Sequence, residues 1–341
     1  MINLLIMRKI LYVLSAVVLL AGCSKENGDA LQKEDAAVPE VRITEPTGGF
    51  VVDKMKWLLI QPQASATNDV SYKWSLKNEE IADEKDLRCV FTQAGTYLLE
   101  LKATNGMGES TQTVTVTVNE KTYINGIARV HEYLPAPGQF INVLPNATNG
   151  DTPESMRQKA ETVLKDGSFV SLGGFGGYVV FGFDHTVVNR SGNDFVVLGN
   201  AISGFGEPGV VMVSYDANGN GLPDDEWFEI AGSEYRKPTT IRNYEITYYQ
   251  PTTEPESATS AYIRWTDNQG QSGYLAKNSS HSQPYYPLWL GDRYTLKGTM
   301  METNLNDPSG NGSGWVNPPF DWGYVDNFPN TDCHKWWLRM T

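Results

Sequence analysis

The fold of the N-terminal part is decided by one stretch, Ala94-Gly95-Thr96-Tyr97-Leu98-Leu99-Glu100-Leu101-Lys102-Ala103-Thr104-Asn105. Tyr97, Leu99, Leu101 and Ala103 occupy alternate positions, and Glu100, Lys102 and Thr104 lie between them. This period of two predicts a β-strand with one buried face. Asn105-Gly106-Met107-Gly108 then predicts a turn. Val114, Val116 and Val118 alternate with threonines, which predicts an antiparallel partner strand.

Residues 40–118 around this stretch form one predicted domain. Val41 and Ile43 open it, and Tyr72-Lys73-Trp74-Ser75 places a tryptophan where sandwich domains bury one. A Gly-Thr-Tyr strand followed by an Asn-x-x-Gly turn resembles the PKD branch of the immunoglobulin-like sandwiches. The resemblance implies a spacer domain in which Trp74 and Tyr97 belong to the core. Cys89 is predicted to be a small core residue.

A larger β-domain is predicted for residues 122–341, after the short polar join of residues 119–121. One helix is expected after Thr152 and Pro153, because Met156, Ala160, Val163 and Leu164 line one stripe before Gly167. Strands are expected at residues 168–172, 178–183, 194–198, 209–215 and 244–249. Many short strands with Gly/Asn/Pro loops predict a jelly-roll-type β-sandwich, so the whole chain is expected to be all-β with one short helix.

The N-terminus carries the pattern of an export signal. Arg8 and Lys9 precede the apolar run Ile10–Leu20, which is too short to span a membrane and ends in Ala21-Gly22-Cys23. This arrangement resembles the bacterial lipobox, which implies a signal peptide at residues 1–22 and acylation of Cys23. Residues 23–39 are predicted to be a flexible tether. Ser24-Lys25-Glu26 resembles an export tag of Bacteroidota surface lipoproteins, so we expect an outer-membrane anchor and exposure at the cell surface.

Composition limits the classes of partner. The formal net charge is −13, and the leader contributes two of the cations, Arg8 and Lys9. Such an acidic chain is not suited to nucleic acid or anionic membrane surfaces. Once Cys23 is acylated, only Cys89 and Cys333 remain, too few for a disulfide scaffold. A packed core must therefore hold the fold.

The densest chemical motif is Asp216-Ala217-Asn218-Gly219-Asn220-Gly221-Leu222-Pro223-Asp224-Asp225-Glu226. Oxygen-bearing side chains fall at alternate positions around a tight turn, as Ca²⁺ prefers. Trp227 stands where an EF-hand has its bidentate glutamate, and Pro223 excludes a helical EF-hand. We therefore predict a structural Ca²⁺ loop within a β-fold; the alternative is a solvated Asn/Gly turn. Its predicted ligands are Asp216, Asn218, Asn220, Asp224, Asp225 and Glu226.

No motif points to catalysis. Leu172-Gly173-Gly174-Phe175-Gly176-Gly177-Tyr178 lacks the lysine and following helix of a phosphate loop, and predicts a tight turn into a strand. His131, His185, His281 and His334 have no metal-ligand spacing, and no G-x-S-x-G motif occurs. A carboxylate pair for glycoside hydrolysis stays open. We predict a binding protein that is not an enzyme.

Aromatic residues gather in two proline-bearing stretches, residues 281–289 and 314–324. Proline stiffens such loops, and exposed rings can stack on planar or sugar-like ligands. The alternative is that most of these rings fill the core. The candidate ligand-binding residues are His281, Tyr285, Tyr286, Trp289, Trp315 and Trp322.

The larger domain resembles a family of Bacteroidota cell-surface lipoproteins. The matching parts are Ser171–Gly177, Phe181–His185, Asn193–Phe195, Gly206–Val210, Asp216–Tyr235, Gln283–Pro287 and Phe320–Tyr324. Some members bind vitamin B12 beside outer-membrane importers, so the resemblance implies capture of cobalamin for a TonB-dependent transporter. Two alternatives stay open: a carbohydrate-binding or adhesion lipoprotein, and a surface glycosidase or esterase.

Residues 329–341 lack strand alternation, and we hypothesise truncation or a frame shift after about residue 328.

Overall fold

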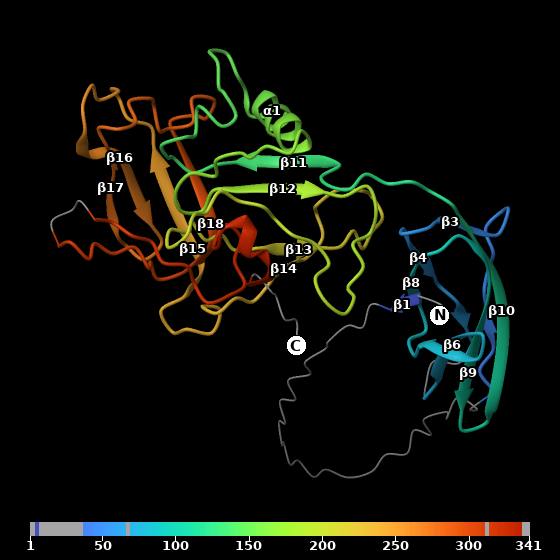
Figure 1. Ribbon diagram of the computed structural model, residues 1–341. Helices are drawn as coiled ribbons and strands as arrows, with labels where there is room; N and C mark the ends of the chain where they lie inside the picture. The colour runs from blue at the N-terminus through green and yellow to red at the C-terminus, as the bar shows by residue number, and fades with distance from the viewer. Residues whose placement is uncertain (1–3, 7–36, 66–68, 311–313, 336–341) are drawn as a thin grey trace, which may run out of the picture. The chain divides into compact units, whose positions relative to one another are not determined.

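The computed structural model describes residues 4–6, 37–65, 69–310 and 314–335 (Figure 1). Two compact units divide the chain. One comprises Met1–Tyr123 and His185–Asp194, and the other comprises Ile124–Asp184 and Phe195–Thr341. Strands dominate both units and only one α-helix occurs among the described residues, which confirms the all-β prediction.

The described residues of the first unit form ten strands in sheets of three, five and two. They are β1 (Leu4–Ile6), β2 (Val41–Arg42), β3 (Phe50–Asp53), β4 (Trp57–Ile60), β5 (Gln63–Ala64), β6 (Ser71–Leu76), β7 (Glu79–Ala82), β8 (Leu87–Phe91), β9 (Gly95–Asn105) and β10 (Gly108–Asn119). The sheet orders are β1-β8-β4, β3-β10-β9-β6-β7 and β2-β5. Strand β1 lies within the predicted signal peptide, so cleavage before Cys23 would remove it.

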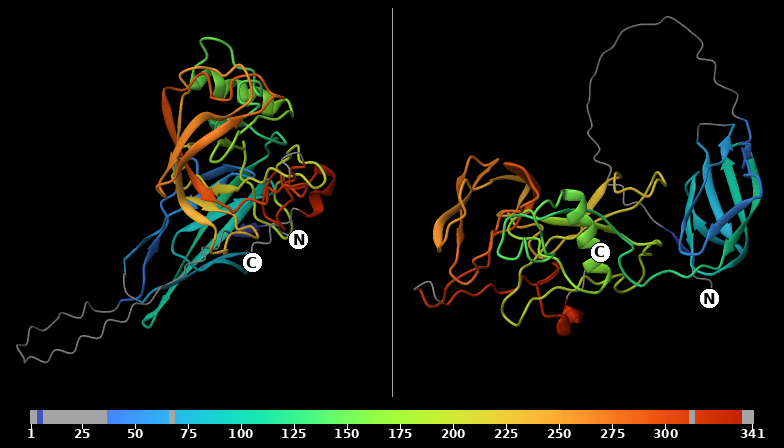
Figure 2. Two further views of the ribbon diagram at one scale, coloured as in Figure 1. Left: turned by 90° about the vertical axis from the view of Figure 1, so that its left-hand side faces the viewer. Right: turned by 90° about the horizontal axis from the view of Figure 1, so that it is seen from above.

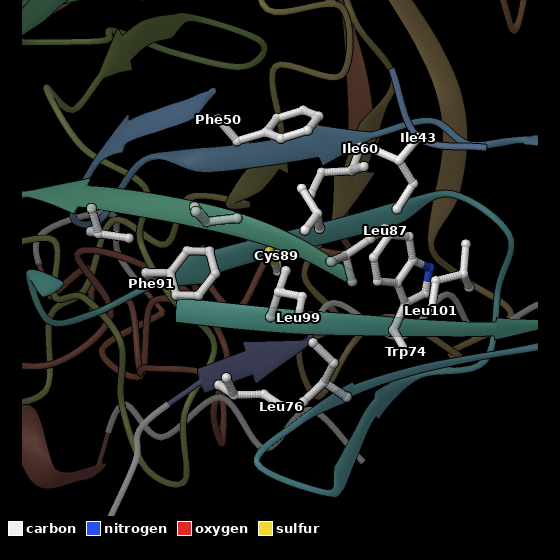
Figure 3. Packing of buried hydrophobic residues seen from close by; sticks show 14 residues of the cluster. Ile43, Phe50, Ile60, Trp74, Leu76, Leu87, Cys89, Phe91, Leu99 and Leu101 are labelled. Atoms are coloured by element: carbon white, nitrogen blue, oxygen red, sulfur yellow. The ribbon is translucent and has the colours of Figure 1, made fainter. Parts of the chain in front are cut away.

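The core of the first unit lies between its two larger sheets. Leu99, Leu101 and Ala103 of β9 are fully buried, as the alternation predicts. Trp74 is also fully buried, and its indole N–H donates to the carbonyl of Lys85 at 3.1 Å. Figure 3 shows Trp74 and Cys89 among the aliphatic side chains of this core. Burial raises the pKa of the Cys89 thiol to about 12, so Cys89 is an inert core residue.

One short segment that follows β12 in the chain belongs to the first unit. This segment is His185–Asp194, and within it the amide of Thr186 donates to the carbonyl of Met55 at 2.7 Å. The rings of Tyr123 and His185 lie 5.1 Å apart. The sequence pattern gives no sign of this excursion, because it depends on bonds between residues far apart in the chain.

The second unit is built around a four-stranded antiparallel sheet in the order β17-β16-β15-β18 (Figures 1 and 2). Its strands are β11 (Arg129–Leu134), β12 (Tyr178–Gly182), β13 (Met212–Ser214), β14 (Trp227–Glu229), β15 (Ile241–Tyr249), β16 (Thr259–Asp267), β17 (Ser272–Lys277) and β18 (Arg293–Met300). β11 pairs with β12, and β13 pairs with β14. One face of the large sheet packs on a core that includes Tyr244, Ile246, Tyr248 and Leu296.

The predicted helix is present as α1 (Pro153–Lys165). Thr152 is its N-cap and forms a capping box with Ser155, and Met156 and Ala160 are fully buried. Glu161 of α1 accepts the amide of Val130 at 3.0 Å, which holds the helix against β11 (Figure 1). A short 3₁₀ segment, η1 (Asn330–Lys335), follows near the C-terminus. Within the described residues, no helix has the length and apolar character needed to cross a membrane.

Several strand predictions were wrong or too long. Residues 168–172 and 194–198 form no strand, and only Met212–Ser214 of residues 209–215 does so. Val196 and Leu198 are largely exposed, so these alternating apolar side chains do not pack into a core. The glycine-rich turn before β12 is confirmed. A Cβ on Gly173 would lie 1.9 Å from the carbonyl oxygen of Ala136, so only glycine fits.

Candidate functional site

The predicted Ca²⁺ loop connects a short hairpin. Strands β13 and β14 pair through Ser214 and Trp227, and residues 215–226 join them. The indole N–H of Trp227 donates to the carbonyl of Pro223 at 3.2 Å, which closes the base of the loop. Trp227 stands where an EF-hand has its last ligand, and here it has a structural role instead.

Four of the six predicted metal ligands lie together. The two carboxylate oxygens of Asp216 accept the amides of Asn220 and Gly221, at 3.0 and 2.9 Å. The side-chain amides of Asn218 and Asn220 donate to the carboxylate of Asp224, at 3.2 and 2.9 Å. These bonds hold the pKa of Asp224 below its usual range. The loop thus gathers side-chain oxygens of the type that Ca²⁺ prefers, and rotation of the two amides would present their oxygens.

The other two predicted ligands lie differently. Asp225 accepts the amide of Ala217 at 3.0 Å, which ties it to the start of the loop. Glu226 is exposed. Among the described residues, no group of three or more His, Cys, Asp or Glu side chains is arranged to hold a metal. The asparagine oxygens are therefore essential to any Ca²⁺ site in this loop.

Three of the six predicted ligand-binding residues belong to the core. Tyr285, Tyr286 and Trp289 are only 3, 2 and 7% exposed, so they cannot stack on a ligand in this structure. The buried side chain of Asn142 explains how this irregular segment is accommodated. Its amide donates to the carbonyls of Pro284 and Tyr286, and its oxygen accepts the amide of Leu288. One asparagine thus satisfies backbone groups that would otherwise need water.

The remaining three candidates are accessible to different degrees. His281 is partly exposed and meets Phe140 edge-on, with ring centroids 4.8 Å apart. Trp315 is 53% exposed and Trp322 is 39% exposed. Both tryptophans lie in segments without regular strands, and isolated bridges fix the backbone beside each: Asn306 pairs with Val316, and Gly209 pairs with Val325.

The backbone around Trp322 is tightly constrained. The carbonyl of Trp322 accepts the amide of Ser233 at 3.0 Å. Gly323 has φ +92°, and a Cβ there would lie 2.4 Å from the Cα of Gly232. Tyr324 is buried, and its hydroxyl accepts the amide of Glu234 at 2.9 Å. Two glycines thus permit residues 321–324 to press against residues 231–234, which fixes the backbone that carries Trp322.

Charged groups surround this segment. Glu234 is 4% exposed, and its carboxylate binds the Lys237 ammonium at 2.7 Å and the Ser233 hydroxyl at 2.9 Å. Glu234 raises the pKa of Lys237, with smaller contributions from Asp321 and Glu302. We name Trp322, Glu234, Lys237 and Asp321 the Trp322 site. It combines an exposed ring with donors and acceptors of both charges.

The sequence alone identified only the ring of this site. Glu234 and Lys237 carry no motif of their own, and the contact depends on Gly232 fitting beneath Tyr324. The sequence offers one sign that the two segments contact each other closely: each contains a glycine, Gly232 in residues 232–235 and Gly323 in residues 322–324. Cys23, the predicted lipidation site, lies outside the described residues, as do residues 336–341 of the unusual tail.

Comparison with known proteins places two parts of the chain. Residues 47–118 match the PKD domain model, and residues 7–24 match the model of the prokaryotic membrane lipoprotein lipid attachment site. The chain is a membrane-anchored lipoprotein with a PKD domain. No curated protein matches the chain. Neither family model concerns cobalamin.

Solved structures share only general similarity with the chain. A quinoprotein alcohol dehydrogenase-like protein from Bacteroides thetaiotaomicron is 15% identical over 26% of this chain and 20% of its own length, with a TM-score of 0.20. Carbohydrate-binding modules of the β-sandwich superfamily are 11% identical over 82% of this chain and 88% of theirs, with a TM-score of 0.21.

A third structure is SGBP-B of a Bacteroides ovatus mixed-linkage glucan utilization locus, in complex with a heptasaccharide. It is 13% identical over 82% of this chain and 76% of its own, with a TM-score of 0.23. The chain spans only a fifth of the quinoprotein. These scores are too low to assign the ligand of any of these structures to this chain.

Proposed function

We propose that this lipoprotein is a non-catalytic glycan-binding protein anchored in the outer membrane and exposed at the cell surface. The observation that carries the proposal is the Trp322 site, where a 39% exposed tryptophan stands on backbone that is hydrogen-bonded to Ser233, next to the Glu234–Lys237 ion pair in the chain. Aromatic rings on rigid backbone contact ligands at low entropic cost. The lipid attachment site at residues 7–24 supports the anchor.

The chemistry of the Trp322 site suits a sugar. An indole offers an apolar face to the C–H groups of a pyranose, and neighbouring polar groups can hydrogen bond to the ring hydroxyls. The Lys237 ammonium is a donor whose orientation is set by the buried Glu234, and Asp321 is an exposed acceptor. Trp315, which is more exposed than Trp322, supplies a second ring earlier on the same stretch of chain.

The loop of residues 216–226 has a supporting role in this proposal. Asp216, Asn218, Asn220 and Asp224 bind Ca²⁺, which braces the β13–β14 connection. The contacts that support this role are those of Asp224 with the two asparagines, because they bring four oxygen-bearing side chains together. The ion has no catalytic duty here.

Calorimetry on the mature chain tests the glycan proposal. Mixed-linkage glucan, xylan and mucin O-glycans are titrated, together with cyanocobalamin, the ligand that the family resemblance implies. We expect saturable heat with at least one glycan and a loss of affinity of tenfold or more in Trp322→Ala. Phe169→Ala, which removes another exposed ring, is the matched control and should bind normally.

Two results would contradict the proposal. Heat with cyanocobalamin and none with any glycan would replace it by cobalamin capture. Release of reducing sugar from a bound glycan, abolished by a single carboxylate substitution, would make the protein a glycosidase.

A further inference from the structure

The outer face of the large sheet in the second unit carries an ordered set of polar side chains that the proposed function does not use. Alternation along β15–β18 sends Tyr244, Ile246, Tyr248 and Leu296 into the core. The intervening residues therefore point to the opposite face. This face comes from the strands drawn in yellow-orange to red-orange in Figure 1.

One row of this face alternates tyrosine and arginine across all four strands. Tyr274 of β17 pairs with Arg264 of β16. The guanidinium of Arg264 lies 4.5 Å from the ring centroid of Tyr249 on β15. Tyr249 in turn pairs with Arg293 of β18. We name Tyr274, Arg264, Tyr249 and Arg293 the arginine row.

Both guanidinium groups are available to an anion. Arg264 and Arg293 are exposed, and within the described parts of the chain neither has a carboxylate within 4.0 Å. The Thr266 hydroxyl, and then Arg264 and Arg293, hold the pKa of the Tyr249 hydroxyl below its usual range, which agrees with a locally positive field. The nearby Lys297 differs, because it is paired with Glu245 at 3.2 Å. In a chain with net charge −13, this row is a local basic feature.

The next row consists of hydroxyl groups. Ser272 pairs with Thr266, Thr266 pairs with Thr247, and Thr247 pairs with Thr295. The hydroxyls of Thr247 and Thr295 lie 2.7 Å apart. The hydroxyl row lies parallel to the arginine row, so charged, aromatic and neutral hydrogen-bonding groups all face solvent together.

We propose that this sheet face binds a linear acidic polysaccharide whose carboxylates come from uronic acid residues. The planar guanidinium matches a carboxylate in bidentate geometry, and the Tyr249 ring orders Arg264 in advance. Arg264 and Arg293 lie on strands separated by one strand, about 10 Å apart from the usual strand spacing. That separation suits carboxylates on alternate sugars of an extended chain.

Tyr274 and the hydroxyl row would contact the same ligand. Tyr274, at 55% exposure, offers its ring to a sugar at the sheet edge, and the hydroxyl row takes sugar hydroxyls. Two guanidinium groups in an acidic chain are too few to hold nucleic acid or a membrane surface by charge alone. Because none of these residues belongs to the Trp322 site, the inference does not rest on the proposed function.

Affinity electrophoresis and calorimetry of the mature chain with polygalacturonate test this inference. We expect wild-type binding that weakens with salt, and a loss of tenfold or more in the double variant Arg264→Gln/Arg293→Gln. Tyr274→Ala should lose several-fold. Fully methyl-esterified polygalacturonate, which keeps the sugar backbone but not the charge, should not bind. Unchanged thermal midpoints of unfolding will establish that these exposed variants fold.

Matched controls separate the arginine row from the other charged and aromatic groups of the second unit. Lys297→Gln removes a cation from the same face and should leave affinity within twofold of wild type, because Lys297 is already paired with Glu245. Trp322→Ala should also bind polygalacturonate normally, whether or not the Trp322 site binds a glycan. No binding by the wild type, equal loss in Lys297→Gln, or loss in Trp322→Ala with the arginine variants unaffected would each overturn the inference. Preference for DNA over polygalacturonate, or for dextran sulfate, an anionic polysaccharide without carboxylates, would overturn it as well.

Discussion

Gly232 lies directly beneath the ring of Tyr324, so closely that a Cβ at position 232 would be 2.3 Å from the Cζ atom of that ring. The neighbouring amide of Glu234 donates to the hydroxyl of the same tyrosine at 2.9 Å. Buried tyrosine, buried glutamate and glycine therefore form one packed unit that constrains the backbone on both sides of Gly323, next to Trp322. The exposed ring depends on a contact that is itself inaccessible to ligand.

Substitution of Gly232 by alanine should affect both stability and binding. The added methyl group must displace the Tyr324 ring, and overpacking of this kind costs about 1–3 kcal/mol in free energy of unfolding. The displacement should also move Trp322 and weaken glycan binding. Urea unfolding and calorimetry measure the two effects. Gly291→Ala is the control, because a Cβ there meets nothing within 4 Å. Equal behaviour of the two variants would contradict the packing argument.

Calcium should stabilise the second unit through residues 216–226. A ligand that binds only the folded state at 100 times its Kd contributes about 2.7 kcal/mol, so millimolar Ca²⁺ should raise the thermal midpoint and EDTA should reverse the change. Asp224→Asn keeps the shape of the side chain but removes the charge, and should abolish the Ca²⁺-dependent shift. Asp83→Asn changes an acid in the first unit and should retain it. A wild-type midpoint that is the same in Ca²⁺ and EDTA would exclude the site.

Acid should weaken the attachment of helix α1. The Lys165 ammonium and then the amide of Val130 lower the pKa of Glu161 from 4.5 to about 2. Because the folded-state pKa is depressed, the stabilisation is complete above pH 4.5 and is lost as pH falls toward 2. Glu161→Gln should therefore lower stability at neutral pH and flatten its dependence between pH 4.5 and 2. Denaturant unfolding across this range measures both effects, and Glu256→Gln, at an exposed site, should leave the pH profile unchanged.

The sequence predicted the structure where one residue pattern determined it. Alternation gave β9 and β10 with their buried faces, and a cap with an apolar stripe gave α1. The burial of Tyr285 and Tyr286 could not be found in this way. It depends on Asn142, whose side chain satisfies their segment across more than a hundred residues. The arginine row could not be predicted from the sequence for the same reason, because only strand register brings Arg264 and Arg293 beside Tyr249.

The difference between core and surface rings gives a final prediction. Tyr286 is 2% exposed, its hydroxyl donates to the carbonyl of Gly291 at 2.6 Å, and its ring meets that of Tyr294 with centroids 5.6 Å apart. Tyr286→Ala should therefore cost about 3–5 kcal/mol of stability, whereas Tyr286→Phe loses one hydrogen bond and about 1 kcal/mol.

Trp322→Ala should show a different balance, with a smaller loss of stability than Tyr286→Ala and weakened glycan binding, because Trp322 is 39% exposed whereas Tyr286 is 2% exposed. Urea unfolding and calorimetry on the same three variants make the comparison direct. Tyr286→Phe should bind the glycan as the wild type does. If Tyr286→Phe lost binding while remaining folded, the buried tyrosine would have a role in recognition, and the division between core rings and contact rings would fail.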